Sequence, residues 1–350
     1  MSGTSLDGID TVLVDFGRMD IAGHFHLPYP ESLRAKLIEL HAPGHDEINR
    51  AALISSELAV LYAESVAGLL MQAKISRKAV NAIGCHGQTV RHRPELGYSI
   101  QLGNAPLLAE LTEITVASDF RSRDIAAGGQ GAPLVPAFHA AMFRDPSVHR
   151  AILNIGGIAN LTDLPISGQV TGFDCGPGNM LMDAWIRQHR GKPYDENGEW
   201  ASQGRIIPEL LESLLNDDYF RLPPPKSTGR DRFNLEWLKK HLEGDEDPAD
   251  IQATLLNLTA ASIAIAIETH CSGAKEVYLC GGGARNPALR KTLEGSLPIY
   301  TTDRLGMPAE QVEAAAFAWL ARQAMKGLTG NLPEVTGAKG GRILGAIHPA

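Results

Sequence analysis

The sequence predicts an α/β protein of layered sheets, arranged in two domains. Short apolar strand-like runs alternate with amphipathic helical runs along the chain, and glycine-rich turns join them. With 350 residues the chain exceeds the usual size of one hydrophobic core. Each half opens with a glycine-bearing hairpin, GTSLDGID and then NIGGIAN, which indicates a weak internal duplication.

The elements follow from periodicity and from their end signals. The run IDTVLVDF alternates apolar and polar residues, which predicts a strand over 9–16. A long amphipathic helix is expected over 46–73, because the acidic Asp46 and Glu47 mark its start. The other expected strands are 79–85, 114–120, two strands around a Gly156-Gly157 turn within 151–164, 169–174 and 276–280. The other expected helices are 105–113, 179–190, one around Leu255, and 308–324.

Composition excludes several classes of protein. A net charge of -8 argues against general nucleic-acid binding, which needs a basic surface. The most apolar run, 255–270, is interrupted by Asn257, Thr259 and Ser262, so we expect no membrane span. No basic start precedes an apolar core, so no signal peptide is expected. The 4 cysteines lack CxxC spacing, which fits a reducing compartment and predicts a cytoplasmic protein.

The glycine-rich segments of the sequence are its candidate ligand-binding sites. The opening MSGTSLDGID is either a decorated turn or a cradle for an anionic group and its metal ion. The cluster YLCGGGARN, between an expected strand and helix, lacks both GxGxxG spacing and a P-loop lysine. Its glycines would nevertheless let a flat base or ribose lie against the backbone. Two glycine hairpins together with this turn favour nucleotide binding over three unrelated turns.

Seven segments together resemble the anhydro-N-acetylmuramic acid kinase family, within the sugar kinase, Hsp70 and actin superfamily. They span the chain: MSGTSLDGID, CHGQT, DFRSRDIAAGGQGAPLVP, NIGGIANLT, FDCGPGNMLMDAW, PKSTGRDRFN and CGGGARN. The resemblance implies two ribonuclease-H-like domains with an interdomain cleft. We expect an N-terminal domain of 1–118 plus 338–350, with the first phosphate loop and part of the sugar site. We expect a C-terminal domain of 119–337, with the second phosphate hairpin, the catalytic aspartate and the adenosine site. Family members carry an apolar strand ahead of the MSGTS loop; here Met1 opens the sequence, so that strand is either short or truncated.

The resemblance implies a definite reaction. Such enzymes use ATP, with Mg²⁺, and water to open the ring of 1,6-anhydro-N-acetylmuramic acid and to phosphorylate O6, in peptidoglycan recycling. Glycosidic cleavage is thus coupled to phosphoryl transfer, and one carboxylate suffices as the base for water. The family also implies a homodimer, with a small anhydro-amino-sugar as substrate and neither nucleic acid nor membrane as a partner.

Site residues follow from the same resemblance. Asp174 matches the base that activates water, and Glu313 helps to orient the attack. Asp7 is expected near Mg²⁺ through water, because this ion dehydrates reluctantly. The expected nucleotide contacts are Gly3, Thr4, Ser5, Leu6, Asp7, Gly8, Ile9 and Asp10 in the first loop, Asn154, Gly156 and Gly157 in the second hairpin, and Gly281, Gly282, Gly283 and Asn286 at the adenosine. The expected sugar contacts are His86, Gln88, Asp119 and Arg121, with Arg121 or Arg123 paired to the lactyl carboxylate.

The residues alone leave alternatives open. Asp174 is either the base or the cap of a turn, and His86 is either a sugar contact or a hydrogen-bonded histidine at a strand end. Glu313 is otherwise a polar position on a partly buried helix, and the segment 225–234 is either a cap over the cleft or a solvated loop. Two other functions also stay open for the whole protein: it is another kinase of the superfamily, or it is a switch driven by nucleotide hydrolysis. A switch would need a partner-binding domain, for which 350 residues leave little room.

Overall fold

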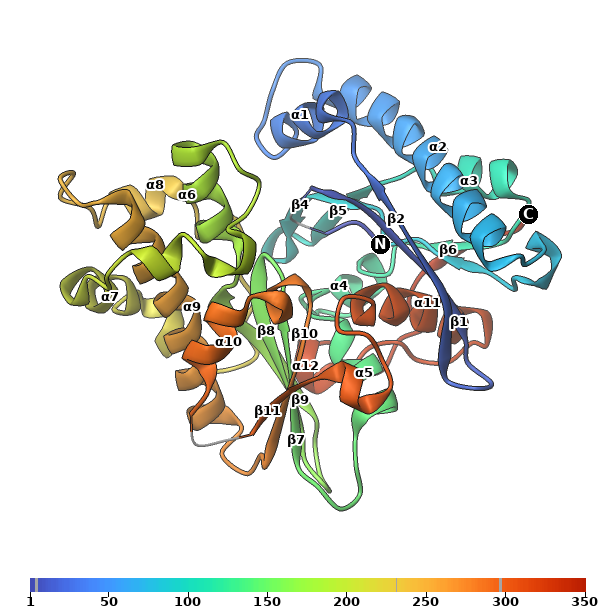
Figure 1. Ribbon diagram of the computed structural model, residues 1–350. Coiled ribbons are helices and arrows are strands. Elements are labelled where there is room, and N and C mark those ends of the chain that lie inside the picture. Colours follow the sequence, from blue (N-terminus) through green and yellow to red (C-terminus); the bar gives the residue numbers. More distant parts are fainter. Residues whose placement is uncertain (4–5, 231, 296–297) are drawn as a thin grey trace. The chain divides into compact units, whose positions relative to one another are not determined.

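The computed structural model describes residues 1–3, 6–230, 232–295 and 298–350, and the chain forms two compact units (Figure 1). Unit 1 comprises Met1–Phe138 and Gln311–Ala350, and unit 2 comprises His139–Glu310. Strands and helices are mixed in both units, so the α/β prediction is confirmed.

Unit 2 is built on one mixed sheet whose strand order is β11-β10-β7-β8-β9. Its strands are β7 Arg150–Ile155, β8 Ile158–Leu164, β9 Thr171–Pro177, β10 Glu276–Cys280 and β11 Ile299–Thr301. β7, β8 and β9 form an antiparallel meander, and β10 and β11 join the other side of β7 in parallel (Figure 1). Three antiparallel strands followed by two parallel ones is the strand order of a ribonuclease-H-like domain, the kind of domain that the family resemblance implies.

Helices cover this sheet. The helices of unit 2 are α6 Met180–Arg190, α7 Pro208–Leu215, α8 Leu235–Lys239, α9 Pro248–His270 and α10 Pro287–Leu293. α9 packs against β8 and β9. It starts at Pro248, where the missing N–H costs nothing, and the side chain of Asp247 accepts a hydrogen bond from the N–H of Ala249 at 2.7 Å. The predicted helices over 179–190 and around Leu255 are therefore confirmed.

The described strands of unit 1 form three small sheets rather than one. They are β1 Gly8–Asp15, β2 Asp20–Pro28, β3 Ile83–Gly84, β4 Gln88–Arg93, β5 Tyr98–Leu102, β6 Val116–Ser118 and β12 Ala346–His348. β1 pairs with β2, β4 pairs with β5, and β6 lies between β3 and β12. The glycine loop at the start of the chain is therefore not a hairpin between strands, because β1 begins only at Gly8 and turns into β2 after Asp15.

Two long helices build the core of unit 1. Its helices are α1 Glu31–Glu39, α2 Glu47–Ala73, α3 Ala105–Thr112, α4 Ser122–Ala126, α11 Val312–Met325 and α12 Pro333–Thr336, and α5 Val135–Phe143 crosses into unit 2. α2 packs against β1, β2 and α3, and α11 packs against β1, β3 and β6. A Cβ on Gly84 would lie 2.1 Å from the carbonyl oxygen of Phe317, so only glycine lets α11 approach β3 so closely.

The units divide at other positions than the predicted 118/119 and 337/338 boundaries. Residues 119–138 and 311–337 both belong to unit 1. The buried carboxylate of Asp124 accepts hydrogen bonds from Asn331 Nδ2 at 2.7 Å and Thr336 Oγ1 at 2.8 Å. The N–H of Gln130 also donates to the carbonyl oxygen of Thr336. These bonds tie the two segments together within one unit.

Candidate functional site

A row of polar side chains crosses the sheet of unit 2 at one level. Asn154 on β7 pairs with Asn160 on β8, and Asn160 pairs with Asp174 on β9. Cys280 on β10 pairs with Asn154 and extends the row, with its Sγ 3.8 Å from Asn154 Oδ1. Directly paired residues project from the same face of a sheet, so these four side chains project together.

Glycine turns follow the row directly. A Cβ on Gly281, whose φ is 79°, would lie 2.4 Å from Asn154 Oδ1, and one on Gly283 would lie 2.4 Å from Ile155 Cγ2. Both glycines are therefore required by close packing against β7. A Cβ on Gly282 would meet no atom within 4 Å among the described residues beyond its chain neighbours, so this glycine borders open space. The turn thus offers exposed backbone beside the polar row.

Asp174 is held through both its main chain and its side chain. It is 7% exposed, and its Oδ2 accepts a hydrogen bond from the N–H of Thr228 at 2.9 Å. Its carbonyl oxygen accepts from Tyr219 Oη at 2.8 Å, and its N–H donates to the carbonyl oxygen of Lys226 at 3.1 Å. The Lys226 ammonium in turn donates to the carbonyl oxygen of Tyr219 at 3.2 Å. The segment from Tyr219 to Thr228 therefore runs along β9 and orients the carboxylate.

Two further oxygen atoms beside this carboxylate are buried without a hydrogen-bond partner among the described residues: Asn160 Oδ1 and Thr228 Oγ1. Leaving such a group unsatisfied costs about 1–3 kcal/mol. Native proteins tolerate this mainly where a ligand or an ordered water completes the set. The surroundings of Asp174 thus have the composition of a site that receives a polar ligand.

The strand position of Asp174 differs from the sequence prediction, and the predicted nucleotide contacts of unit 2 have hydrogen-bond partners within the protein. Asp174 does not lie at the end of its strand, because β9 continues to Pro177 opposite β8. Gly156 and Gly157 form the predicted turn, but their carbonyl oxygens also accept hydrogen bonds from the chain that enters α6. Asn286, expected at the adenosine, accepts a hydrogen bond from the N–H of Leu289 at 3.1 Å and caps α10.

In unit 1 the predicted sugar ligand Arg121 is fixed at both guanidinium ends. Its Nη1 donates to the carbonyl oxygen of Gly131 at 2.7 Å, and its Nη2 lies 2.9 Å from His86 Nε2. A guanidinium only donates, so His86 accepts through an unprotonated Nε2. Burial and the charge of Arg121 lower the pKa of His86 well below its ordinary value, which agrees with this assignment. The ring of His86 also packs 4.4 Å from that of Phe317, so the contacts of His86 are those of a residue that supports Arg121.

The first loop is partly built into the core. Leu6 and Ile9 are 4% and 2% exposed and belong to the hydrophobic core, so only their main chain is available to a nucleotide. A Cβ on Gly8 would lie 2.5 Å from a carbonyl oxygen of β2, so glycine is required there. Gln88 Nε2 donates to the carbonyl oxygen of Gly3 at 3.1 Å, which makes Gln88 a support of this loop.

The predicted acidic and hydroxyl groups of the loop have different environments. Thr4 and Ser5 lie outside the described residues. The side chain of Asp7 is exposed, whereas the Asp10 carboxylate lies 3.0 Å from His26 Nδ1 and 3.3 Å from His24 Nε2 on β2. Among the residues that the structure describes, no group of three or more His, Cys, Asp or Glu side chains could hold a metal ion. A magnesium ion here would depend mainly on phosphate oxygens and water for its ligands.

Two other predicted residues are also in unit 1. Asp119 is exposed and lies just before α4, where its Oδ1 accepts hydrogen bonds from Ser122 Oγ at 2.6 Å and from the Ser122 N–H at 3.3 Å. Glu313 lies in the first turn of α11. Burial raises the pKa of Glu313, and the charge of Arg121 opposes that shift. A carboxyl group with a raised pKa is suited to proton exchange.

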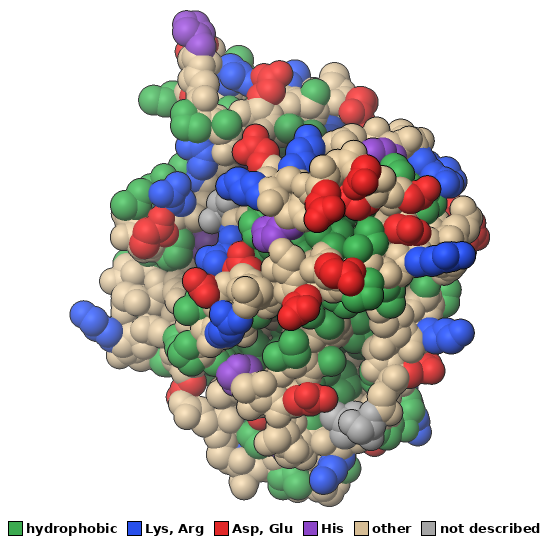
Figure 2. Space-filling model, turned by 90° about the vertical axis from the view of Figure 1, so that its left-hand side faces the viewer, with side chains coloured by type: hydrophobic (Ala, Val, Ile, Leu, Met, Phe, Trp, Pro, Cys, Tyr) green, Lys and Arg blue, Asp and Glu red, His purple; other side chains and the backbone are tan. Residues whose placement is uncertain are grey.

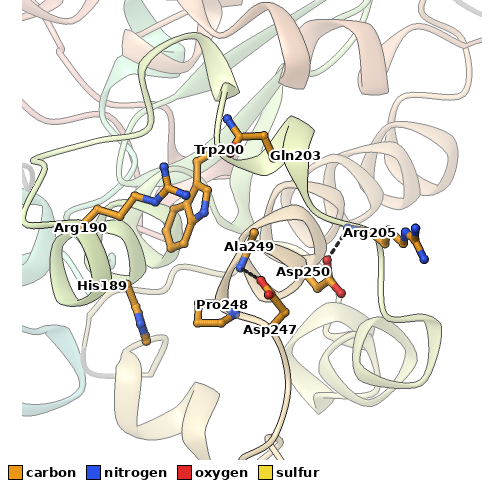
Figure 3. Close-up of a pocket in the computed structure, with 9 residues that line it drawn as sticks. All are labelled: His189, Arg190, Trp200, Gln203, Arg205, Asp247, Pro248, Ala249 and Asp250. Carbon is orange, nitrogen blue, oxygen red and sulfur yellow. Dashed lines mark hydrogen bonds between the residues drawn. The ribbon is translucent and has the colours of Figure 1, made fainter.

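A surface pocket of about 640 Å³ lies elsewhere in unit 2, at the start of α9 (Figure 3). Two hydrogen bonds join residues of its lining: the Ala249 N–H donates to Asp247 Oδ1 at 2.7 Å, and the Arg205 N–H donates to Asp250 Oδ1 at 2.7 Å. The guanidinium of Arg190 lies 4.6 Å from the ring centre of Trp200. The lining contains no predicted site residue, so this pocket is separate from the polar row.

A family model described as anhydro-N-acetylmuramic acid kinase matches residues 1–350. The chain belongs to the anhydro-N-acetylmuramic acid kinase family. A relative of that name from Nitrosospira multiformis is 59% identical over 357 aligned residues, which cover 100% of this chain and 98% of the relative. One from Nitrosomonas europaea is 58% identical with the same coverage. Among solved structures, component A of (R)-2-hydroxyglutaryl-CoA dehydratase from Acidaminococcus fermentans aligns with a TM-score of 0.44 at 14% identity, covering 89% of this chain and 98% of its own, a likeness too weak to bear on function.

Membership of the anhydro-N-acetylmuramic acid kinase family confirms the predicted resemblance and the prediction of an enzyme, and a kinase family implies the use of ATP. Three residues of the site were not singled out from the sequence: Asn160, Lys226 and Thr228. Asn160 ends the quoted motif NIGGIAN, and its position opposite Asp174 depends on the β8–β9 register. Lys226 and Thr228 lie in the segment PKSTGRDRFN, where a loop remained one of two open interpretations.

The expectations that the protein spans no membrane and binds no nucleic acid remain predictions for this member of the anhydro-N-acetylmuramic acid kinase family. By length and composition α2 and α9 are apolar enough to span a membrane, a criterion that core helices of soluble proteins also meet. In α9 67% of the apolar window is buried, and in α2 33%. On the face drawn in Figure 2, basic and acidic side chains are interspersed, without a continuous basic area.

Proposed function

We propose that the protein transfers the γ-phosphoryl group of ATP to O6 of 1,6-anhydro-N-acetylmuramic acid while water opens the anhydro ring, giving N-acetylmuramic acid 6-phosphate. Family membership supports the substrate, because the relatives are named for it. The observation that carries the proposal is Asp174: a buried, oriented carboxylate with two unsatisfied oxygen atoms beside it. Such a group suits the activation of water in a sheltered site. The reaction would serve peptidoglycan recycling in the cytoplasm, in a homodimeric enzyme.

Asp174 would act as the general base. It removes a proton from the attacking water as the oxygen of that water bonds to the anomeric carbon and the bond from that carbon to O6 breaks. The N–H of Thr228 holds Oδ2, so the plane of the carboxylate is set before the substrate arrives. O6 leaves with the pair of electrons and bonds to the γ-phosphorus of ATP, while the bond from that phosphorus to the β–γ bridging oxygen breaks and ADP leaves.

The nucleotide would lie on the glycine turns. Gly282 borders open space, and Gly281 and Gly283 bring the turn against β7, so the backbone here fits a flat group such as adenosine. Asn154, Gly156 and Gly157 would face the phosphates from the second hairpin. In the first loop Gly3, Gly8 and the main chain of Leu6 and Ile9 would do the same, with Thr4 and Ser5 as further donors. Bound Mg²⁺ would neutralise charge on the phosphates, with Asp7 near it through water.

The sugar would be bound by unit 1 through Arg121. Its planar guanidinium suits the lactyl carboxylate, and His86 and Gly131 fix its direction. Gln88 and Asp119 would act as neighbours of that contact, and Glu313 would help to orient the attack. These roles follow the family motif residue by residue.

Mass spectrometry of the product tests the proposal. Anhydro-N-acetylmuramic acid, ATP and magnesium are incubated with the protein in oxygen-18 water. We expect the product to gain one phosphoryl group and one labelled oxygen at the anomeric carbon. Phosphorylation without label would refute ring opening by water, and the absence of any phosphorylated sugar would refute the substrate.

A further inference from the structure

We propose that Asn160 is a second catalytic residue: its side-chain oxygen holds the attacking water against Asp174. This inference rests on the function proposed above and adds the acceptor for the second proton of that water. Its basis is the position of Asn160, the state of its oxygen and the chemistry of water.

Asn160 and Asp174 are cross-strand partners on the same face of the sheet. Side chains of such a pair start with their Cβ atoms about 4.5–5.5 Å apart. A water molecule with donor–acceptor distances of about 2.8 Å fits between two oxygen atoms at the ends of such side chains. The β8–β9 register shifts between Ala159 and Asn160, and such bulges commonly re-aim a side chain next to an active site.

The oxygen atom of Asn160 is prepared for a donor. Asn160 Oδ1 is buried and has no hydrogen-bond partner among the described residues, although the residue itself is only partly buried. Next to the carboxylate, Thr228 donates its N–H to Asp174 Oδ2 while its own Oγ1 is buried and unsatisfied among the described residues. A buried water is stable where 2–4 polar partners surround it. Asp174, Asn160 and Thr228 together supply three.

The chemistry requires such an acceptor. The attacking water uses a lone pair to form the bond to the anomeric carbon, and one of its protons passes to Asp174. Its other proton stays on the new hydroxyl group, and the acidity of that proton rises as the oxygen gives up electron density. A neutral carbonyl oxygen at Asn160 accepts a hydrogen bond from this proton without competing for the first one. The interaction strengthens toward the transition state, so it accelerates the reaction rather than merely binding substrate.

The variant Asn160→Leu tests this directly. It keeps the branched shape of the side chain, with somewhat larger methyl groups, but has no acceptor, so we expect kcat to fall about tenfold or more, the effect of one hydrogen bond to a developing charge. We expect KM for sugar and for ATP to change less than about twofold. The melting temperature should stay equal or rise, because an unsatisfied buried oxygen is removed. Asn257→Leu, a polar residue of α9 in the same unit, is the matched control and should leave kinetics unchanged.

A second variant distinguishes the loss of the acceptor oxygen from the loss of the amide NH2 group. Asn160→Asp keeps an oxygen in place but adds a charge beside Asp174, which raises the pKa of a neighbouring carboxyl group. We expect the acid limb of its kcat/KM profile to move to higher pH. Above that limb it should be about tenfold faster than Asn160→Leu.

Several results would overturn the inference. A folded Asn160→Leu variant with wild-type kcat would remove Asn160 from catalysis, and a raised KM at constant kcat would make it a sugar contact. Loss of folding or of thermal stability would make it structural, since the proposal expects neither. If the wild-type protein itself gives no phosphorylated sugar, the proposed function fails. An active wild type with an equally active Asn160→Leu variant refutes only the role of Asn160.

Discussion

Two neighbouring glycines, Gly282 and Gly283, should respond in opposite ways to the same substitution. A Cβ on Gly283 would lie 2.4 Å from Ile155 Cγ2 and 3.0 Å from its carbonyl oxygen. Overpacking of this kind costs about 1–3 kcal/mol. For a unit of this size, in which 1 kcal/mol corresponds to about 2–4 °C, we expect Gly283→Ala to lower the melting temperature by roughly 2–12 °C. At Gly282 the added methyl group meets open space, so Gly282→Ala should change stability by no more than about 0.5 kcal/mol.

The nucleotide decides what Gly282→Ala does to function. If adenosine lies against this turn, the methyl group occupies its space, and the dissociation constant for ATP should rise about tenfold, a loss of roughly 1.4 kcal/mol. Isothermal titration calorimetry with a non-hydrolysable ATP analogue measures the affinity, and scanning calorimetry measures stability. A Gly282→Ala protein that binds the analogue as wild type does would refute the placement of the nucleotide. An unchanged melting temperature for Gly283→Ala would refute the packing argument.

Three further outcomes are expected. Asp174→Asn can still accept from the Thr228 N–H but cannot take a proton, so kcat should fall at least ~100-fold with ATP affinity unchanged, as rapid-quench and binding assays would report. Burial lowers the pKa of His139 to about 3, so the unfolded chain binds the extra proton. The contribution of neutral His139 to the free energy of unfolding is therefore fully present above pH ~6.5 and is lost as the pH falls toward 3. At pH 5 the loss is about 2 kcal/mol. Urea titrations should measure this loss in the wild type, and the His139→Gln variant should not show it. Asp124→Ala should cost unit 1 at least about 3 kcal/mol in the same assay, because three donors lose their acceptor, and a loss below 1 kcal/mol would contradict this count.

The elements of the fold that could be predicted are those encoded by residues close together in the sequence. The strands β7, β8 and β10 could be predicted because each contains a run of apolar residues. In the structure most residues of these runs are buried. In contrast, β2 contains His24 and His26, and its partner is identified only through the β1–β2 register. The polar strand β4 carries no apolar alternation, and β5 alternates over only five residues; neither was predicted.

The site shows the same division. Asp174 could be singled out as a candidate because the motif around it is contiguous in sequence. Thr228 approaches Asp174 from 54 positions away, and no periodicity encodes that contact. Likewise Gly282 and Gly283 look alike in sequence, and only packing against Ile155 distinguishes them. Pairwise contacts across strands and loops are the information that a single sequence does not display.

The discontinuity of unit 1 has a consequence for the order of events on the ribosome. Unit 2 is one continuous stretch, His139–Glu310, so all of its strands have been synthesised before the last 40 positions emerge. Unit 1 cannot pair β6 with β12, or satisfy Asp124 through Asn331 and Thr336, until translation is nearly finished. Since domains fold as units during synthesis, the middle of the chain matures first and the amino-terminal segment waits for the carboxyl terminus. Nascent chains stalled after Glu310 has left the ribosome, but while the carboxyl-terminal segment is still inside it, should therefore resist protease over unit 2 while the first 138 residues are still cut.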